Sequence, residues 1–153
     1  MNRDDLIELV NIEFNYLDST IASINELNDI IGRNQPDKFQ MAAISKLMCD
    51  VYNGTENILK RFCKFLKIPI PSGGYSHTNL LLLFNNPANK NLPQFFDNDI
   101  FDDYKALLKF RHYVIHGYAF HLEWNIIKSS VIKIESIEKH FKENVFSFIN
   151  SLK

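Results

Sequence analysis

Apolar residues recur every three or four positions through most of this chain, which is the spacing of one face of an α-helix. The first run lies between residues 4 and 31 and consists of Leu6, Val10, Phe14, Leu17, Ile21, Ile24 and Ile31. Gly32 and Pro36 follow, and both residue types end helices. The pattern therefore predicts a long first helix, which would gain its stability by packing against other helices.

Runs of the same kind predict four further helices. The second helix is expected to begin at Asp37, a suitable N-cap, and to end at Ile68 and Pro69. A short third helix spans about residues 78–84. Asp97 or Asn98 can cap a helix that closes at Gly117, and a last helix runs from about residue 125 to 152. Strand-like alternation is absent from the sequence. We expect an all-α fold, an antiparallel four- to five-helix bundle in one domain of residues 1–153.

The composition excludes some classes of protein. A formal net charge of −1 over 153 residues gives no overall basic signature for nucleic-acid binding. Cys49 and Cys63 lie on apolar helical positions, which suits buried thiols in a reducing compartment. No apolar signal-peptide segment follows Met1, and the longest apolar run, residues 80–84, is far too short to cross a bilayer. We expect a cytoplasmic protein with no membrane association.

Residues 110–118 contain the least expected side chain, the guanidinium of Arg111 in the middle of an apolar helical stripe. A charge in that position is costly unless it has a partner or reaches a polar cleft. His112 and His116 lie four residues apart, on one flank of the same helix face. Gly117 can take the left-handed conformation that ends a helix, and Tyr118 follows it.

These residue types suit phosphate chemistry. Cleavage of RNA through its own 2′-hydroxyl needs a base, an acid and positive charge for the phosphate oxygens. Histidine, with an unperturbed pKa of about 6.5, can take either proton role, and arginine can hold a phosphate with two parallel hydrogen bonds. Other interpretations stay open: Arg111 at the edge of the core with its head group in solvent, His112 and His116 as zinc ligands without a recognisable third, and Tyr118 as an interface tyrosine.

A polar block at residues 52–57 lies inside the second helix and contains Gly54. Glycine there costs about 1 kcal/mol relative to alanine, which suggests the close approach of another backbone. Basic residues follow the block, and they either complement the helix dipole or face RNA. His77 has no cluster of supporting residues, so we interpret it as a surface loop residue.

The order Arg111, four residues, His116, one residue, Tyr118 resembles the motif of the HEPN superfamily, and within it that of the HepT-like toxin ribonucleases. His112 stands where these proteins commonly carry a polar residue. The segment 52–61 is similar to their second helix, and residues 122–124 are similar to the start of their last helix. The resemblance covers most of residues 40–125.

The resemblance implies metal-independent cleavage of RNA, with tRNA as the expected substrate, and it implies no cofactor. It also implies a two-fold homodimer that brings two motif helices to one cleft. Arg111 and His116 would be catalytic, with His112 and Glu56 in support and Asp50 as the other candidate for the acid. The expected RNA-binding side chains are Lys60, Arg61, Lys64 and Lys109.

By resemblance, Tyr118 is the residue to which a minimal nucleotidyltransferase antitoxin transfers AMP from ATP, in a type VII-like toxin–antitoxin pair. The alternative is a catalytically silent HEPN bundle that serves only as the binding partner of such a nucleotidyltransferase. The joint presence of Arg111, His116 and Tyr118 favours the ribonuclease, and toxicity on expression separates the two.

Overall fold

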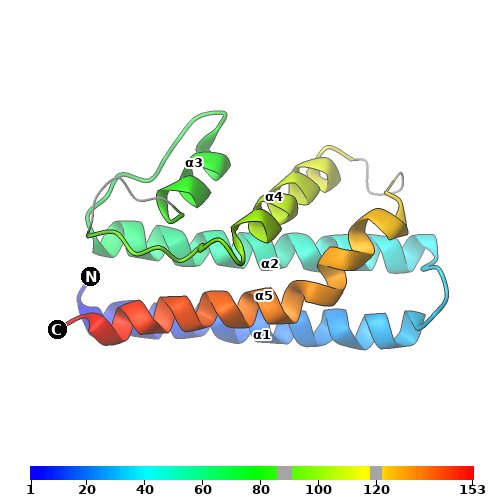
Figure 1. Ribbon diagram of the computed structural model, residues 1–153, viewed down its shortest axis with the longest axis horizontal. Coiled ribbons are helices and arrows are strands. Elements are labelled where there is room, and N and C mark those ends of the chain that lie inside the picture. Colours follow the sequence, from blue (N-terminus) through cyan, green and yellow to red (C-terminus); the bar gives the residue numbers. More distant parts are fainter. Residues whose placement is uncertain (86–90, 118–121) are drawn as a thin grey trace.

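Five helices and no strand make up the part of the chain that the computed structural model describes, residues 1–85, 91–117 and 122–153. The helices are α1 (Arg3–Ile31), α2 (Lys38–Phe65), α3 (Ser76–Leu83), α4 (Phe101–Ile115) and α5 (Trp124–Ser151). Figure 1 shows α1 and α2 as long antiparallel helices, with α5 running back along α1 so that both chain ends lie together. The shorter α3 and α4 lie on α2. The predicted all-α bundle is confirmed.

The helix ends follow local sequence signals, with two exceptions. Asp37 caps α2 by accepting a hydrogen bond from the backbone N–H of Gln40, as predicted, and Gly117 follows α4 with a φ of 85°. However, α4 begins at Phe101 after Ile100, which has no side-chain cap, so the predicted capping by Asp97 or Asn98 is wrong. The short helix α3 begins at Ser76, earlier than predicted, which places His77 in a helix.

The core lies where the apolar stripes of the long helices meet. All seven stripe residues predicted for α1 are buried. At Gly54 the close neighbour is a side chain rather than the expected backbone, because an added Cβ would lie 2.7 Å from Cδ2 of Leu17. Any larger residue at this position, directly beside Asn53, would force the Leu17 side chain of α1 to shift.

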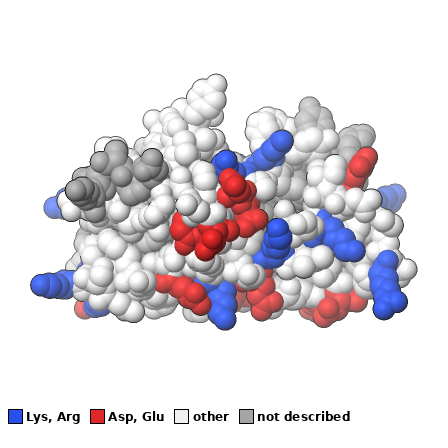
Figure 2. All heavy atoms as spheres, in the orientation of Figure 1, with Lys and Arg blue, Asp and Glu red and all other residues white. Residues whose placement is uncertain are grey.

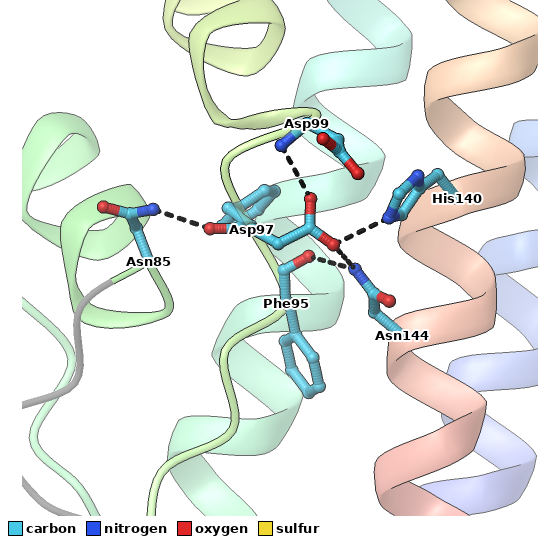
Figure 3. Close-up of polar contacts among 7 residues, drawn as sticks. Asn85, Phe95, Asp97, Asp99, His140 and Asn144 are labelled. Atoms are coloured by element: carbon cyan, nitrogen blue, oxygen red, sulfur yellow. Dashed lines mark hydrogen bonds and ion pairs between the residues drawn. The ribbon is translucent and has the colours of Figure 1, made fainter.

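The segment before α4 is irregular in backbone but firmly packed. Phe95 and Phe96 are fully buried, and the ring of Phe96 stacks on that of Phe141 in α5 with centroids 5.3 Å apart. Figure 3 shows the polar contacts of the same segment: Asp97 Oδ2 lies 2.7 Å from Nε2 of His140 and accepts a hydrogen bond from Asn144 Nδ2. These contacts fasten residues 95–97 to α5 and so fix the start of α4.

The apolar stripe of α4 becomes exposed toward its C-terminal end. Tyr104 and Leu107 are buried, Leu108 is half-buried, and Ile115 is 56% exposed. In Figure 1 the axis of α4 is inclined to that of α2, so its last turns leave the core. None of the helices in the described ranges combines the length and the apolarity needed to cross a membrane.

Candidate functional site

Arg111 is half-buried on α4 and is held by α2. Its Nε donates a hydrogen bond of 2.7 Å to Oδ1 of Asn53, which lies beside the tightly packed Gly54. Burial raises the pKa of the Cys49 thiol, and the nearby charge of Arg111 opposes that rise. The guanidinium thus lies at the boundary between core and surface, and Asn53 supplies the partner that a charge on an apolar stripe needs.

The two motif histidines are exposed and in contact with each other. Their ring centroids are 4.2 Å apart with the planes inclined at 61°, as the four-residue spacing predicts. His116 is the C-cap residue of α4, and its backbone N–H donates to the carbonyl of His112. The pair therefore lies at the outer end of α4, next to Arg111 in sequence. Tyr118, the predicted AMP acceptor, lies outside the described residues.

Glu56 is only 4% exposed, and its carboxylate is joined to His77 of α3. Its Oε2 lies 2.6 Å from Nδ1 of His77, and its Oε1 lies 3.8 Å from Nζ of Lys60. The interpretation of His77 as a surface loop residue is therefore wrong, because the ring is half-buried in the first turn of α3. No spacing in the sequence signals this contact, since 21 residues separate the two side chains.

The comparison with protein families decides the class of the protein. A family model described as HepT-like protein matches residues 43–152. This chain belongs to the HepT-like family of the HEPN superfamily. The matched range contains Asn53, Glu56, His77, Arg111 and His116. Comparisons with curated proteins and with solved structures found no match.

The predicted RNA-binding cations of this HepT-like chain fall in two places. Lys60, Arg61 and Lys64 line a groove of about 630 Å³ that also includes Glu13 of α1. There the guanidinium of Arg61 lies 3.5 Å from the Glu13 carboxylate, so part of the charge is neutralised within the fold. Lys109 instead lies on α4, in the cleft that His112 also lines.

That cleft, which we call the α3–α4 cleft, has a volume of about 360 Å³. His77 of α3 and His112 of α4 both line it, so it connects the Glu56–His77 pair with the motif helix. In Figure 2 the surface is hollowed between α3 and α4, and basic atoms with acidic atoms beside them border the hollow. The structure thus brings His77, His112 and Lys109 to one opening and leaves Lys60, Arg61 and Lys64 in another.

A group that could share a metal ion lies away from the motif of the HepT-like chain. Among the described residues, Asp97, Asp99 and His140 place one ligand atom each within 4.8 Å of one another. Both oxygens of Asp97 already accept hydrogen bonds, Oδ1 from the Asp99 backbone and Oδ2 from Asn144, and Oδ2 also contacts His140 (Figure 3). These contacts explain the cluster as a structural link between residues 95–97, which precede α4, and α5.

Proposed function

We propose that this HepT-like protein is a ribonuclease that cleaves RNA without a metal ion, with tRNA as the expected substrate class. Its membership of the family supports the class of protein. The observation that carries the proposal is the combination of an anchored arginine with two contacting histidines at the end of one helix. Phosphate binding and proton transfer need these side chains close together.

Arg111 would bind the scissile phosphate. Its Nε is engaged by Asn53, so the two terminal nitrogens of the guanidinium are the ones to donate to phosphate oxygens. Arginine keeps its charge at all relevant pH values and can make two parallel hydrogen bonds to a phosphate. Because Asn53 restricts the side chain, less conformational freedom is lost when RNA binds.

His116 would carry a proton, with His112 as its assistant. One group takes the proton of the 2′-hydroxyl, whose oxygen attacks phosphorus, and another gives a proton to the 5′-oxygen as the phosphorus–oxygen bond breaks. The products are a 2′,3′-cyclic phosphate and a 5′-hydroxyl. Both histidines are exposed, so RNA can reach them. Imidazole suits both proton roles near neutral pH.

A homodimer would complete the site. An apolar groove of about 350 Å³ lies between α4 and the start of α5, and Phe110, Tyr113, Ile126 and Ile127 line it. Ile126 is 70% exposed, and Ile115 at the end of the motif helix is exposed as well. A second copy covering this face would bury the apolar surface and place two Arg111–His116 pairs near one another.

The test is cleavage of total RNA by purified protein in the presence of EDTA. Wild-type protein should cleave, whereas Arg111→Ala and His116→Ala should each lower the rate by about a hundred- to a thousandfold. Arg33→Ala, at an exposed arginine in the α1–α2 turn, is the matched control and should behave as wild type.

Two outcomes would contradict the proposal. If zinc restores cleavage that EDTA has stopped, His112 and His116 act as metal ligands instead. If wild-type protein neither cleaves RNA nor is toxic on expression, the chain is the non-catalytic partner of a nucleotidyltransferase.

Regulation at Tyr118 forms the second part of the proposal. A minimal nucleotidyltransferase antitoxin would join the Tyr118 oxygen to the α-phosphate of ATP and release pyrophosphate. The added phosphodiester and base would compete with RNA for Arg111. After incubation with antitoxin and ATP, the intact mass of wild-type protein should increase by one or more AMP units, and that of Tyr118→Phe should not. An unchanged wild-type mass would rule out this modification and leave the ribonuclease proposal standing.

A further inference from the structure

The α3–α4 cleft has an apolar wall that a flat, uncharged ring could cover. Leu81 is buried there, Phe101 and Leu108 are half-buried, and Leu82 is 44% exposed. At about 360 Å³ the cleft lies within the size range of small-molecule sites in proteins. Exposed apolar side chains beside such a hollow favour a ligand with an apolar face.

The α4 side of the cleft is also basic, and Lys105 Nζ lies 4.9 Å from the centre of the Phe101 ring. Lys105, Lys109 and His112 recur at helical spacing on one face of α4, and His116 continues the same row. From Lys105 to His116 the row extends about 16 Å along the helix axis. Lys105 pairs with Asp102 at 3.2 Å, but both side chains are exposed, so this ion pair is weak and a phosphate can compete for the lysine.

A fixed imidazole adds a polar group to the cleft. Nδ1 of His77 is engaged by the buried carboxylate of Glu56, which leaves Nε2 as the ring nitrogen able to meet a ligand. Because the acid is buried and the ring is packed in α3, His77 is held in place before any ligand arrives. The cleft therefore offers an apolar surface, a row of cations and one preorganised polar group.

We propose that the α3–α4 cleft binds a nucleotide of the RNA that flanks the scissile phosphate. Its base lies against Leu82, and its phosphates follow Lys105 and Lys109 toward His116. This arrangement matches sites for single-stranded nucleic acid, which combine a basic path for the backbone with an apolar face for the base. The inference rests on the proposed function, since the row of cations ends at the proposed catalytic histidine.

Binding should be measured in full-length His116→Ala, so that RNA is not cleaved during the experiment. The probes are a short fluorescent single-stranded RNA and the same RNA without its bases. Adding Leu82→Ser should weaken binding of the complete RNA by about fivefold or more and leave binding of the abasic RNA unchanged. Because Leu82 is partly exposed, this substitution should not unfold the protein.

The row of cations is tested with matched lysine pairs. The double variant Lys105→Ala, Lys109→Ala should bind both RNAs more weakly, and its binding should depend less on salt. Lys128→Ala with Lys133→Ala, at exposed positions of α5, removes the same charge elsewhere and should have a smaller effect. The proposal would be overturned if the two double variants lost the same amount of RNA affinity. It would also be overturned if Leu82→Ser weakened binding of the complete and the abasic RNA equally.

Crosslinking with 4-thiouridine RNA gives an independent readout. Crosslinks should map to α3 or to residues 101–109. Crosslinks confined to the groove of Lys60, Arg61 and Lys64 would reject the cleft, as would a finding that Leu82→Ser only disrupts association with another protein. If wild-type protein cleaves RNA but no crosslink reaches the cleft, only this inference fails. If RNA binds the cleft but is never cleaved, only the proposed catalysis fails.

Discussion

Arg111 illustrates how one residue can be anomalous in sequence and accounted for in the fold. The partner Asn53 is 58 residues away in the chain and belongs to another helix. A hydrogen bond from a charged donor contributes about 1.5–3 kcal/mol, more than a neutral one. The same contact that makes the half-buried charge tolerable also restricts the direction of the guanidinium, and in the proposed mechanism this is the group that binds phosphate.

We therefore expect Asn53→Ala to lower RNA cleavage about tenfold while the protein stays folded. Loss of the acceptor frees the guanidinium to move, and 1.4 kcal/mol of lost positioning corresponds to that factor. Initial rates at several RNA concentrations separate a change in kcat from a change in KM. Asn57→Ala, at an exposed asparagine of the same helix, is the control. If both variants cleave RNA equally well, Asn53 does not position Arg111.

At the scale of elements, α4 depends on how residues 95–97 are attached to α5. Partial burial disfavours the charged form of Asp97, but hydrogen bonds from Asn144, His140 and the backbone of Asp99 outweigh it and hold the pKa of Asp97 below its ordinary value. Phe95 and Phe96, which directly precede Asp97, bury their rings in the core. The position of the motif helix is thus linked to a carboxylate that must stay ionised.

The sign of the pH dependence follows from that lowered pKa. Asp97 contributes stability fully above its unfolded pKa of about 3.9, and the contribution is lost as pH falls through the lower pKa of the folded state. We expect Asp97→Asn to melt about 2–4 °C below wild type at neutral pH, which corresponds to about 1 kcal/mol for a partly exposed group. This difference in melting temperature should shrink and disappear as the pH falls below about 4.

Thermal unfolding at several pH values from 7 to 3 measures this difference in melting temperature. Asp99→Asn, at the exposed acid of the same turn, should stay near wild type at every pH. A difference that persists unchanged at pH 3 would show that Asp97 stabilises the segment by a contact independent of its charge.

At the scale of the whole molecule, one group of exposed apolar side chains lies beside the motif helix. The groove between α4 and α5 is lined by Phe110, Tyr113 and Ile126, and Ile115 is exposed at the end of the same helix. Contiguous apolar surface of this kind usually marks an interface. Pairing of two copies across it would bring together catalytic groups that one chain supplies only once.

We expect the wild-type protein to have twice its chain mass of 17.9 kDa in solution and Ile126→Glu to be monomeric. A charge on the groove is costly to bury unless it is paired. Ile132→Glu changes another exposed isoleucine of α5, one that does not line the groove, and should leave the dimer intact. Light scattering after size exclusion measures the masses, and cleavage should be lost together with the dimer.

The local pattern of the sequence determined the helices of this protein. Every stripe residue predicted for α1 is buried, and Asp37 and Gly117 mark helix ends as expected, because periodicity, capping and glycine conformation act within a few residues. The motif spacing likewise predicted the contact of His112 with His116, since both lie on one helix. The family resemblance, carried by the motif and the block of residues 52–61, was confirmed as well.

Only the tertiary structure decided which side chains meet across helices. The pairing of Glu56 with His77, the anchoring of Arg111 by Asn53 and the cleft between α3 and α4 all depend on the angles at which helices pack. Those angles result from packing over the whole core, such as the contact of Gly54 with Leu17, and no short stretch of sequence encodes them. His77 looked like a loop residue because α3 begins without a capping side chain, and only the fold shows its contact with the buried Glu56.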